Sequence, residues 1–179
     1  NISFIDSYFE AISGFTSTGF TIFENIKNLD ESLILWRSSS QWLGGLYFLF
    51  SIVLLIDIFD NNFKKSLTNF LTFNTSETLK QSLKILILYS SLTFIIFLIL
   101  NSIDLRSFVA FNISMTLISS GGFLPVDSLS VILNSEFKEI VFSLLMLSSF
   151  FSIFLVYNLI FIKSKNINFF HEDLYLFFY

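Results

Sequence analysis

The sequence is poor in the residues that form disulfides, metal sites and most hydrolytic centres. Among 179 residues it has no cysteine, one histidine and one proline. The absence of cysteine excludes disulfides, thiolate metal ligands and cysteine nucleophiles. The single proline leaves long helices uninterrupted. His171 lies beside Glu172 and Asp173, and one histidine with two acids is a poor metal site, so we interpret this stretch as a solvated loop.

Charge is also scarce. Charged residues make up 13% of the chain and hydrophobic residues 54%, whereas soluble domains carry about 25% charged residues. This composition predicts a membrane protein whose main partner is the lipid bilayer. No basic face for nucleic acid is present. No Ser/His/Asp set or phosphate-cradling glycine loop is present either, so we predict that the chain is not an enzyme and needs no cofactor.

The apolar runs predict an all-α membrane protein. Residues 32–59, 85–100 and 140–162 form three long apolar segments, and about 20 residues suffice to cross a bilayer, with tilt and flanking residues adjusting the length. Two shorter apolar segments, 3–15 and 107–118, reach only about halfway across. Ser3 with Asp6 three residues later resembles a capping box and places the start of the first short helix.

A glycine-containing polar run follows each short segment. Ser17-Thr18-Gly19-Phe20 follows the first, and Ser120-Gly121-Gly122-Phe123 follows the second, with Pro125 preventing further helix. Aligning the two Gly-Phe pairs also aligns the apolar lead-ins, which indicates an internal repeat. Unwound backbone at membrane depth is tolerated only inside protein or beside a water-filled path. Its carbonyl and hydroxyl oxygens suit a hard monovalent cation.

The charges predict an orientation, because lysines and acids fall on opposite sides of the predicted spans. By the positive-inside rule the lysine side is cytoplasmic and the short helices enter from outside. The lysines are Lys64, Lys65, Lys80, Lys84, Lys163 and Lys165, and the acids are Asp6, Glu10, Glu24, Asp30, Glu31, Asp104, Asp127, Glu136 and Glu139. The resulting unit is a helix, a re-entrant pore half-helix, a polar run and a second helix, repeated as in potassium channels.

At these motifs the sequence resembles a known family. The run from Ser7 to Phe20, with Trp36-Arg37 and Gln41-Trp42-Leu43-Gly44-Gly45, is similar to the first pore repeat of the TrkH/KtrB family of bacterial potassium-uptake proteins. Ile118 to Phe123 resembles the second filter of that family, and His171 to Tyr175 resembles the lead into its third repeat. The resemblance implies four repeats in one chain around one pore.

On this resemblance the chain is an internal piece of a longer protein. Residues 1–60 would hold the end of the first pore repeat, 61–84 a cytoplasmic linker, 85–165 the second repeat, and 166–179 the lead into the third. The resemblance also implies a multi-pass protein of the inner (plasma) membrane, a homodimer, and a cytoplasmic nucleotide-binding regulatory subunit.

The resemblance also implies which residues would bind potassium at the filter. Either Gly121 or Gly122 could correspond to Gly19. In plant relatives a serine in place of the first filter glycine accompanies sodium transport, so Gly19 favours potassium, whereas Ser120-Gly121 departs from the family pattern. The implied filter residues are Ser17, Thr18 and Gly19 from the first repeat and Ser119, Ser120, Gly121 and Gly122 from the second.

Four other residues are candidates for structural support of the filter. Arg37 either pairs with a carboxylate such as Glu10 and braces the short helix, or extends to the membrane interface. Gly44 and Gly45 should permit close helix contact.

The predicted function is potassium transport down its electrochemical gradient through a carbonyl-lined filter. A sodium- or proton-coupled carrier is the first alternative, although the spans 85–100 and 140–162 have no acid of the kind such carriers usually need. The second alternative is a non-conducting membrane scaffold subunit.

Overall fold

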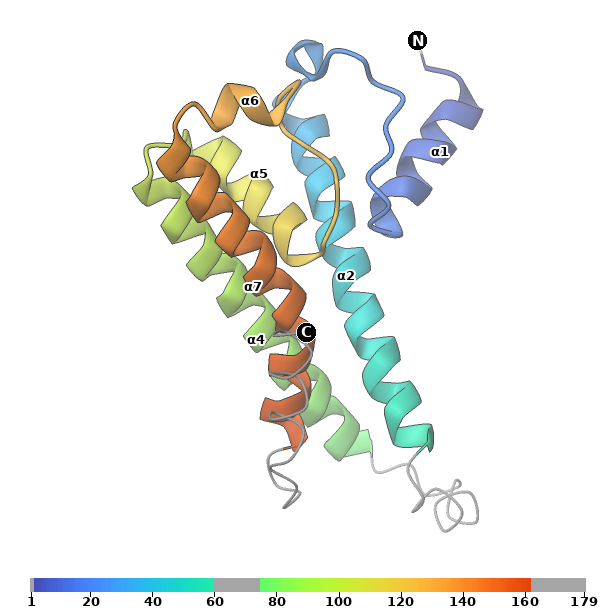
Figure 1. Ribbon diagram of the computed structural model, residues 1–179. Helices are drawn as coiled ribbons and strands as arrows, with labels where there is room; N and C mark the ends of the chain where they lie inside the picture. Colours follow the sequence, from blue (N-terminus) through green and yellow to red (C-terminus); the bar gives the residue numbers. More distant parts are fainter. Residues whose placement is uncertain (1, 60–74, 162–179) are drawn as a thin grey trace.

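The computed structural model describes residues 2–59 and 75–161, and within these ranges it contains helices and loops but no strand (Figure 1). The predicted all-α class is therefore confirmed for the described residues. Much of the predicted linker, the lead into a third repeat and His171 lie outside them. The elements are α1 (Phe4–Phe15), η1 (Ile26–Asn28), α2 (Glu31–Phe59), α4 (Thr75–Ser102), α5 (Ser107–Ile118), α6 (Leu129–Ile132) and α7 (Glu136–Phe161).

The two short helices have the bounds that the sequence predicted. α5 covers residues 107–118, and α1 follows its N-cap, Ser3. The Ser3 hydroxyl oxygen accepts a hydrogen bond from the Asp6 backbone N–H at 3.1 Å and donates one to the Asp6 carboxylate at 2.7 Å. Such a cap satisfies a backbone donor that the first turn otherwise leaves free.

Two long helices begin earlier than the apolar runs indicated. α4 starts at Thr75, so the predicted span from 85 continues a helix that begins within the predicted linker, 61–84. No Gly or Pro interrupts this stretch, and extending a helix costs less than nucleating a new one. α7 starts with Glu136 and Glu139 in its first turn, where negative charge favours the helix N-terminus.

The short helices lie among the long ones in different ways. α1 and α5 both begin at the same end of the bundle, extend about halfway along it, and are followed by loops that return to that end (Figure 1). α5 packs against α2, α4 and α7, whereas the main contact of α1 is with α2. Accordingly α5 is buried almost throughout from Ala110 to Ile118, while α1 buries only Glu10, Ser13 and Gly14.

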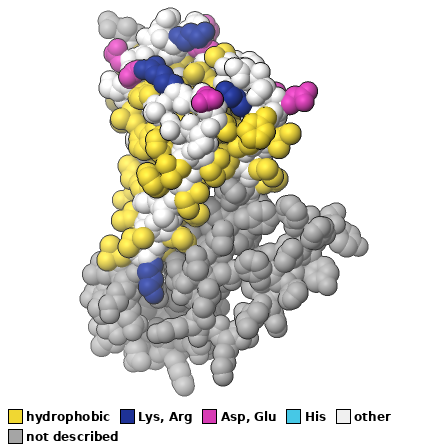
Figure 2. All heavy atoms as spheres, turned by 90° about the vertical axis from the view of Figure 1, so that its left-hand side faces the viewer, with side chains coloured by type: hydrophobic (Ala, Val, Ile, Leu, Met, Phe, Trp, Pro, Cys, Tyr) yellow, Lys and Arg dark blue, Asp and Glu magenta, His cyan; other side chains and the backbone are white. Residues whose placement is uncertain are grey.

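The surface divides into a charged end and an apolar belt. Figure 2 shows acidic and basic side chains gathered at the end where the short helices begin, above a band of hydrophobic side chains. Within the described residues one segment, Ser82–Ser102, is long and apolar enough to cross a membrane, and Ser107–Ile118 is apolar but shorter. Large apolar side chains exposed on α4 and α7 include Ile87, Phe94, Ile95, Leu98, Ile140, Leu144 and Leu147. A belt of this kind is expected for surface that faces lipid.

Candidate functional site

The loops that follow α1 and α5 begin with the same backbone conformation over their first two residues. Thr16, the first residue after α1, has a φ of −83° and a ψ of 2°. Ser119, the first residue after α5, has a φ of −85° and a ψ of 0°. The next residue, Ser17 or Ser120, has a φ of 53° in both loops. A positive φ costs a non-glycine residue about 1–2 kcal/mol, so the surrounding structure holds the same strained turn twice.

The hydrogen bonds of the two turns also correspond, and they fix how the two loops align. The Ser17 N–H donates to Gly14 O at 3.0 Å, and the Ser120 N–H donates to Leu117 O at 3.0 Å. The following N–H groups, of Thr18 and Gly121, donate to Ser13 O at 3.0 Å and Thr116 O at 2.8 Å. The alignment that pairs these residues pairs Gly19 with Gly122, and so resolves which of the two glycines corresponds to Gly19.

These two glycines are in contact with each other. Gly19 has a φ of 80°, and a Cβ added to it would collide with Cα of Gly122 and lie 2.6 Å from N of Gly122. A Cβ added to Gly122 would lie 3.1 Å from Gly19 Cα. Gly19 is therefore required twice, because of its positive φ and because of the close approach of the second loop.

The remaining predicted filter residues present their hydroxyl groups differently. The Thr16 and Thr18 hydroxyls share a hydrogen bond of 2.7 Å at the exposed end of α1. The Ser119 hydroxyl is buried and donates to Met115 O or Thr116 O, at 3.0 and 3.1 Å. Within the described part of the chain no group of three or more His, Asp or Glu residues could hold a metal ion.

A buried ion pair lies behind the first loop. The Arg37 side chain is 1% exposed and its Nε donates to Glu10 Oε1 at 2.7 Å. The same carboxylate accepts hydrogen bonds from the Thr21 hydroxyl at 2.9 Å and the Ile22 N–H at 3.1 Å, and Arg37 Nη2 donates to the Thr21 hydroxyl at 2.9 Å. Arg37 thus connects α2, α1 and the returning first loop, and does not extend to the surface.

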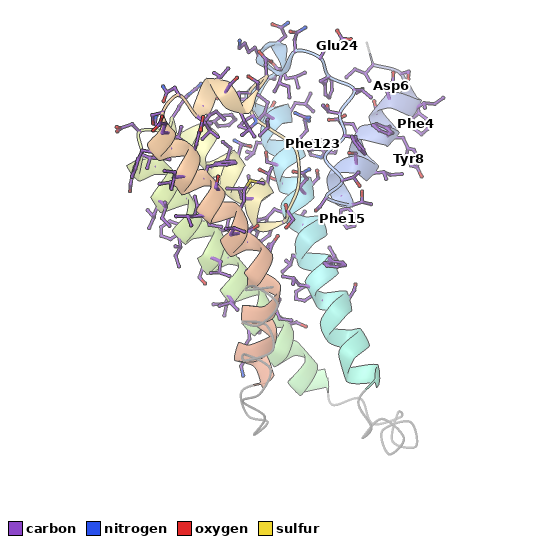
Figure 3. The ribbon with its side chains drawn as sticks, viewed as in Figure 1. Phe4, Asp6, Tyr8, Phe15, Glu24 and Phe123 are labelled. Carbon is purple, nitrogen blue, oxygen red and sulfur yellow. The ribbon has the colours of Figure 1, made fainter. Side chains whose placement is uncertain are left out.

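Arg37 also contacts the second loop. Its guanidinium carbon lies 4.1 Å from the centre of the Phe123 ring, and Phe123 is 1% exposed. Figure 3 shows Phe123 on the loop that returns from α5 beside α2, whereas Phe4 and Tyr8 lie on the face of α1 that points away from the bundle. Among the described residues Arg37 Nη1 has no hydrogen-bond partner, so its contact in this region is with an aromatic face, which attracts cations.

Gly44 and Gly45 lie where the ends of both short helices approach α2. A Cβ on Gly44 would collide with the carbonyl of Phe15, the last residue of α1. A Cβ on Gly45 would lie 2.6 Å from the Tyr89 hydroxyl and 2.8 Å from Ser119 Cβ. The pair therefore allows the end of α1, the loop after α5 and α4 to approach α2 closely.

Sequence reasoning did not assign a role to Gln41. Gln41 is fully buried; its side chain contacts the second loop, and its main-chain oxygen contacts Ser17 of the first. Gln41 follows Arg37 by four residues and so lies on the same face of α2. The polar run from Arg37 to Gln41, inside an otherwise apolar helix, was the available signal.

A second ion pair, Lys27–Asp127, links the two loops at the charged end of the bundle. Asp127 Oδ1 accepts hydrogen bonds from the Ile26 N–H at 2.8 Å and the Lys27 N–H at 3.2 Å, and Asp127 Oδ2 lies 3.0 Å from Lys27 Nζ. The Lys27 ammonium, helped by these N–H groups, lowers the pKa of Asp127 below its ordinary value of 3.8. One carboxylate therefore joins the loop after α1 to the loop after α5.

We expect Asp127→Asn to lower the melting temperature of the purified full-length protein at pH 7. A lowered folded-state pKa stabilises the fold above the unfolded-state pKa, and this contribution is lost as the pH falls through the folded value. The difference between variant and wild type should therefore shrink as the pH falls below the ordinary Asp127 pKa of 3.8. Lys27→Met, which removes the other partner, should show the same pH dependence. A difference that persists unchanged at low pH would show that the charge of Asp127 is not its cause.

Known proteins that match this chain are cation transporters. An uncharacterized cation transporter of Methanocaldococcus jannaschii is 30% identical over 162 residues, which cover 84% of this chain and 32% of that protein. The Trk system potassium uptake protein TrkI of Halomonas elongata is 44% identical over 45 residues, or 25% of this chain and 9% of that protein. TrkG of Escherichia coli, also a Trk system potassium uptake protein, is 39% identical over 46 residues, or 26% of this chain and 10% of that protein.

The chain spans about a third of the length of the Methanocaldococcus protein, and its matches to TrkI and TrkG are local. No protein-family model matches the sequence, and no solved structure matches it. The names of these relatives agree with the family that the motifs around Gly19 and Gly122 had indicated. The prediction from those motifs is confirmed, and the chain belongs to the TrkH-like family of cation-transport proteins.

Proposed function

We propose that this chain forms part of a potassium-conducting pore in which the loops after α1 and α5 are two segments of the selectivity filter. The observation that carries the proposal is the repeated strained turn, which brings Gly19 and Gly122 into contact from two distant parts of the sequence. We propose potassium as the ion because the Trk relatives are named as potassium uptake proteins. In a bilayer α1 and α5 would be re-entrant half-helices, entering from the face at which they begin.

The C-terminal ends of the two short helices favour a cation beside them. α1 and α5 both end at the loops, and the C-terminal end of a helix carries a partial negative charge. The carbonyl groups of the loops and the exposed Thr18 hydroxyl add oxygen ligands of the kind that replace the water shell of potassium. Ser17 to Gly19 and Ser119 to Gly122 are the residues that we assign to the filter.

Two observations favour a pore over the alternatives. A coupled carrier usually has a carboxylate that binds or releases its coupling ion, but Glu10, the buried acid of α1, already pairs with Arg37 at 2.7 Å. A non-conducting scaffold has no requirement for two matching strained turns at Ser17 and Ser120. We extend the proposal to the homodimer, the cytoplasmic nucleotide-binding subunit and the inner membrane that the family resemblance implies.

Ion flux measured with the purified full-length protein in liposomes tests this proposal. We expect potassium to move down an imposed gradient, faster than sodium, and without any requirement for a sodium or proton gradient. Growth of a bacterium that lacks its own potassium uptake systems, in medium of low potassium concentration, is the matching test in cells. Absence of potassium flux from folded protein, or flux that stops without a second ion gradient, would contradict the proposed function.

A further inference from the structure

Gln41 holds the second loop by its backbone N–H groups. Oriented so that its oxygen faces the loop, the Gln41 carboxamide accepts hydrogen bonds from the Gly122 N–H at 3.1 Å and the Phe123 N–H at 3.3 Å. The main-chain oxygen of Gln41 also accepts a hydrogen bond from the Ser17 hydroxyl at 3.4 Å. One fully buried residue of α2 therefore contacts both proposed filter segments.

These contacts decide which way two carbonyl groups point. The described chain has no cis peptide bond, and in a trans peptide unit the C=O and the N–H point in opposite directions. The Gly122 N–H shares a peptide unit with the Gly121 carbonyl, and the Phe123 N–H shares one with the Gly122 carbonyl. Because both N–H groups point at Gln41, both carbonyl oxygens point away from Gln41 and α2.

Gly121 shows how closely this loop lies on Gln41. A Cβ added to Gly121 would lie 2.5 Å from the Gln41 carboxamide carbon and would collide with its oxygen. The glycine therefore lets the two peptide units lie against the carboxamide. The side chain of Gln41 is at the same time prevented from turning toward another partner.

We propose that Gln41 is a specificity-determining positioning residue, which turns the Gly121 and Gly122 carbonyl oxygens toward the ion path. This inference rests on the proposed function. A buried N–H without an acceptor costs about 1–3 kcal/mol, so a peptide unit that loses Gln41 rotates toward another partner and takes its carbonyl with it. Discrimination between potassium and sodium depends on the number and arrangement of such carbonyls, so discrimination is what Gln41 controls.

The test compares variants of Gln41 in the full-length protein reconstituted in liposomes. Gln41→Met keeps the length of the side chain but has no strong acceptor, and we expect the potassium-to-sodium flux ratio to fall about tenfold. Gln41→Glu keeps an acceptor of the same reach whether or not it is protonated, and should retain the ratio within about twofold. Ser51→Ala is the control, since Ser51 lies on α2 and, among the described residues, its hydroxyl bonds only to Tyr47 O of the same helix.

Each outcome bears on the inference. A flux ratio for Gln41→Met equal to that of wild type, in protein of normal abundance and melting temperature, would overturn it. An equal fall of the flux ratio in Gln41→Glu would also overturn it, because this variant keeps the acceptor. A role in packing alone would not make the ratio lower in Gln41→Met than in Gln41→Glu. If Gln41→Met does not fold, Gln41→Asn, whose amide is one methylene too short to reach the loop, should lower the ratio, and a retained ratio would overturn the inference. Wild-type protein without potassium flux would instead contradict the proposed function itself.

Discussion

Gly19→Ala should abolish potassium uptake by the full-length protein, whereas Gly122→Ala should only reduce it. Gly19 has a φ of 80°, which costs alanine about 1–2 kcal/mol, and its new Cβ would collide with the backbone of Gly122. Backbone of the second loop must then move, which displaces the proposed filter carbonyls. Gly122 has no positive φ, and its new Cβ would be 3.1 Å from Gly19 Cα, so a small shift accommodates it.

The comparison requires equal amounts of each variant in the membrane. Uptake of potassium into cells that lack other uptake systems gives the rates, and the two alanine variants differ from each other only in the loop that carries the extra methyl group. We expect a loss of at least about a hundredfold for Gly19→Ala, corresponding to about 3 kcal/mol, and about tenfold or less for Gly122→Ala. Full uptake by Gly19→Ala would contradict the assignment of this loop to the filter.

Arg37→Gln should greatly reduce the amount of folded protein. Arg37 and Glu10 are 1% and 4% exposed, and they share a bond of 2.7 Å. Removing one partner of a buried ion pair leaves the other charge uncompensated and costs about 3–5 kcal/mol, a large share of the stability of a typical domain. Thr21 and the Ile22 N–H continue to bond the Glu10 carboxylate, so the loss should lie toward the lower part of that range.

A double-mutant cycle separates the ion pair from the packing of Arg37. The variant Glu10→Gln/Arg37→Gln buries no unpaired charge and should recover part of the abundance and melting temperature lost in Arg37→Gln. Recovery should be incomplete, because the contact of the guanidinium with the Phe123 ring is also lost. Normal abundance and uptake in Arg37→Gln alone would show that the pair does not support the loops.

The positions of the short helices could be predicted from the sequence because local signals define them. Ser3 with Asp6 begins α1, and Pro125 and the glycine-containing runs follow the helix ends. The earlier start of α4 was missed because the apolar run begins only at Ile85, while the polar residues from Thr75 continue the same helix. Apolarity shows which residues can face lipid but does not limit how far a helix continues into water.

Contacts between distant segments were harder to predict. Arg37 had two interpretations in the sequence, and the choice between them depended on the fold, which brings Glu10 to within 2.7 Å. Gln41 and Asp127 accept hydrogen bonds from backbone N–H groups of a loop far away in the sequence. A partner that contributes only its backbone can be of almost any residue type, so the sequence gives no sign of such a contact. Gly121 and Gly122 were ambiguous because the matching turn begins at Ser120, whose φ is not visible in the sequence.

The shared use of α2 has a consequence for how the protein is made. α2 contacts α1, which precedes it, and α5, which follows it after α4. Since synthesis proceeds from the N-terminus and structured units form as they emerge, Arg37 and Gln41 leave the ribosome before the loop that carries Phe123. The surface of α2 is thus made before the second loop that packs against it, and an early error in placing α2 would affect both α1 and α5.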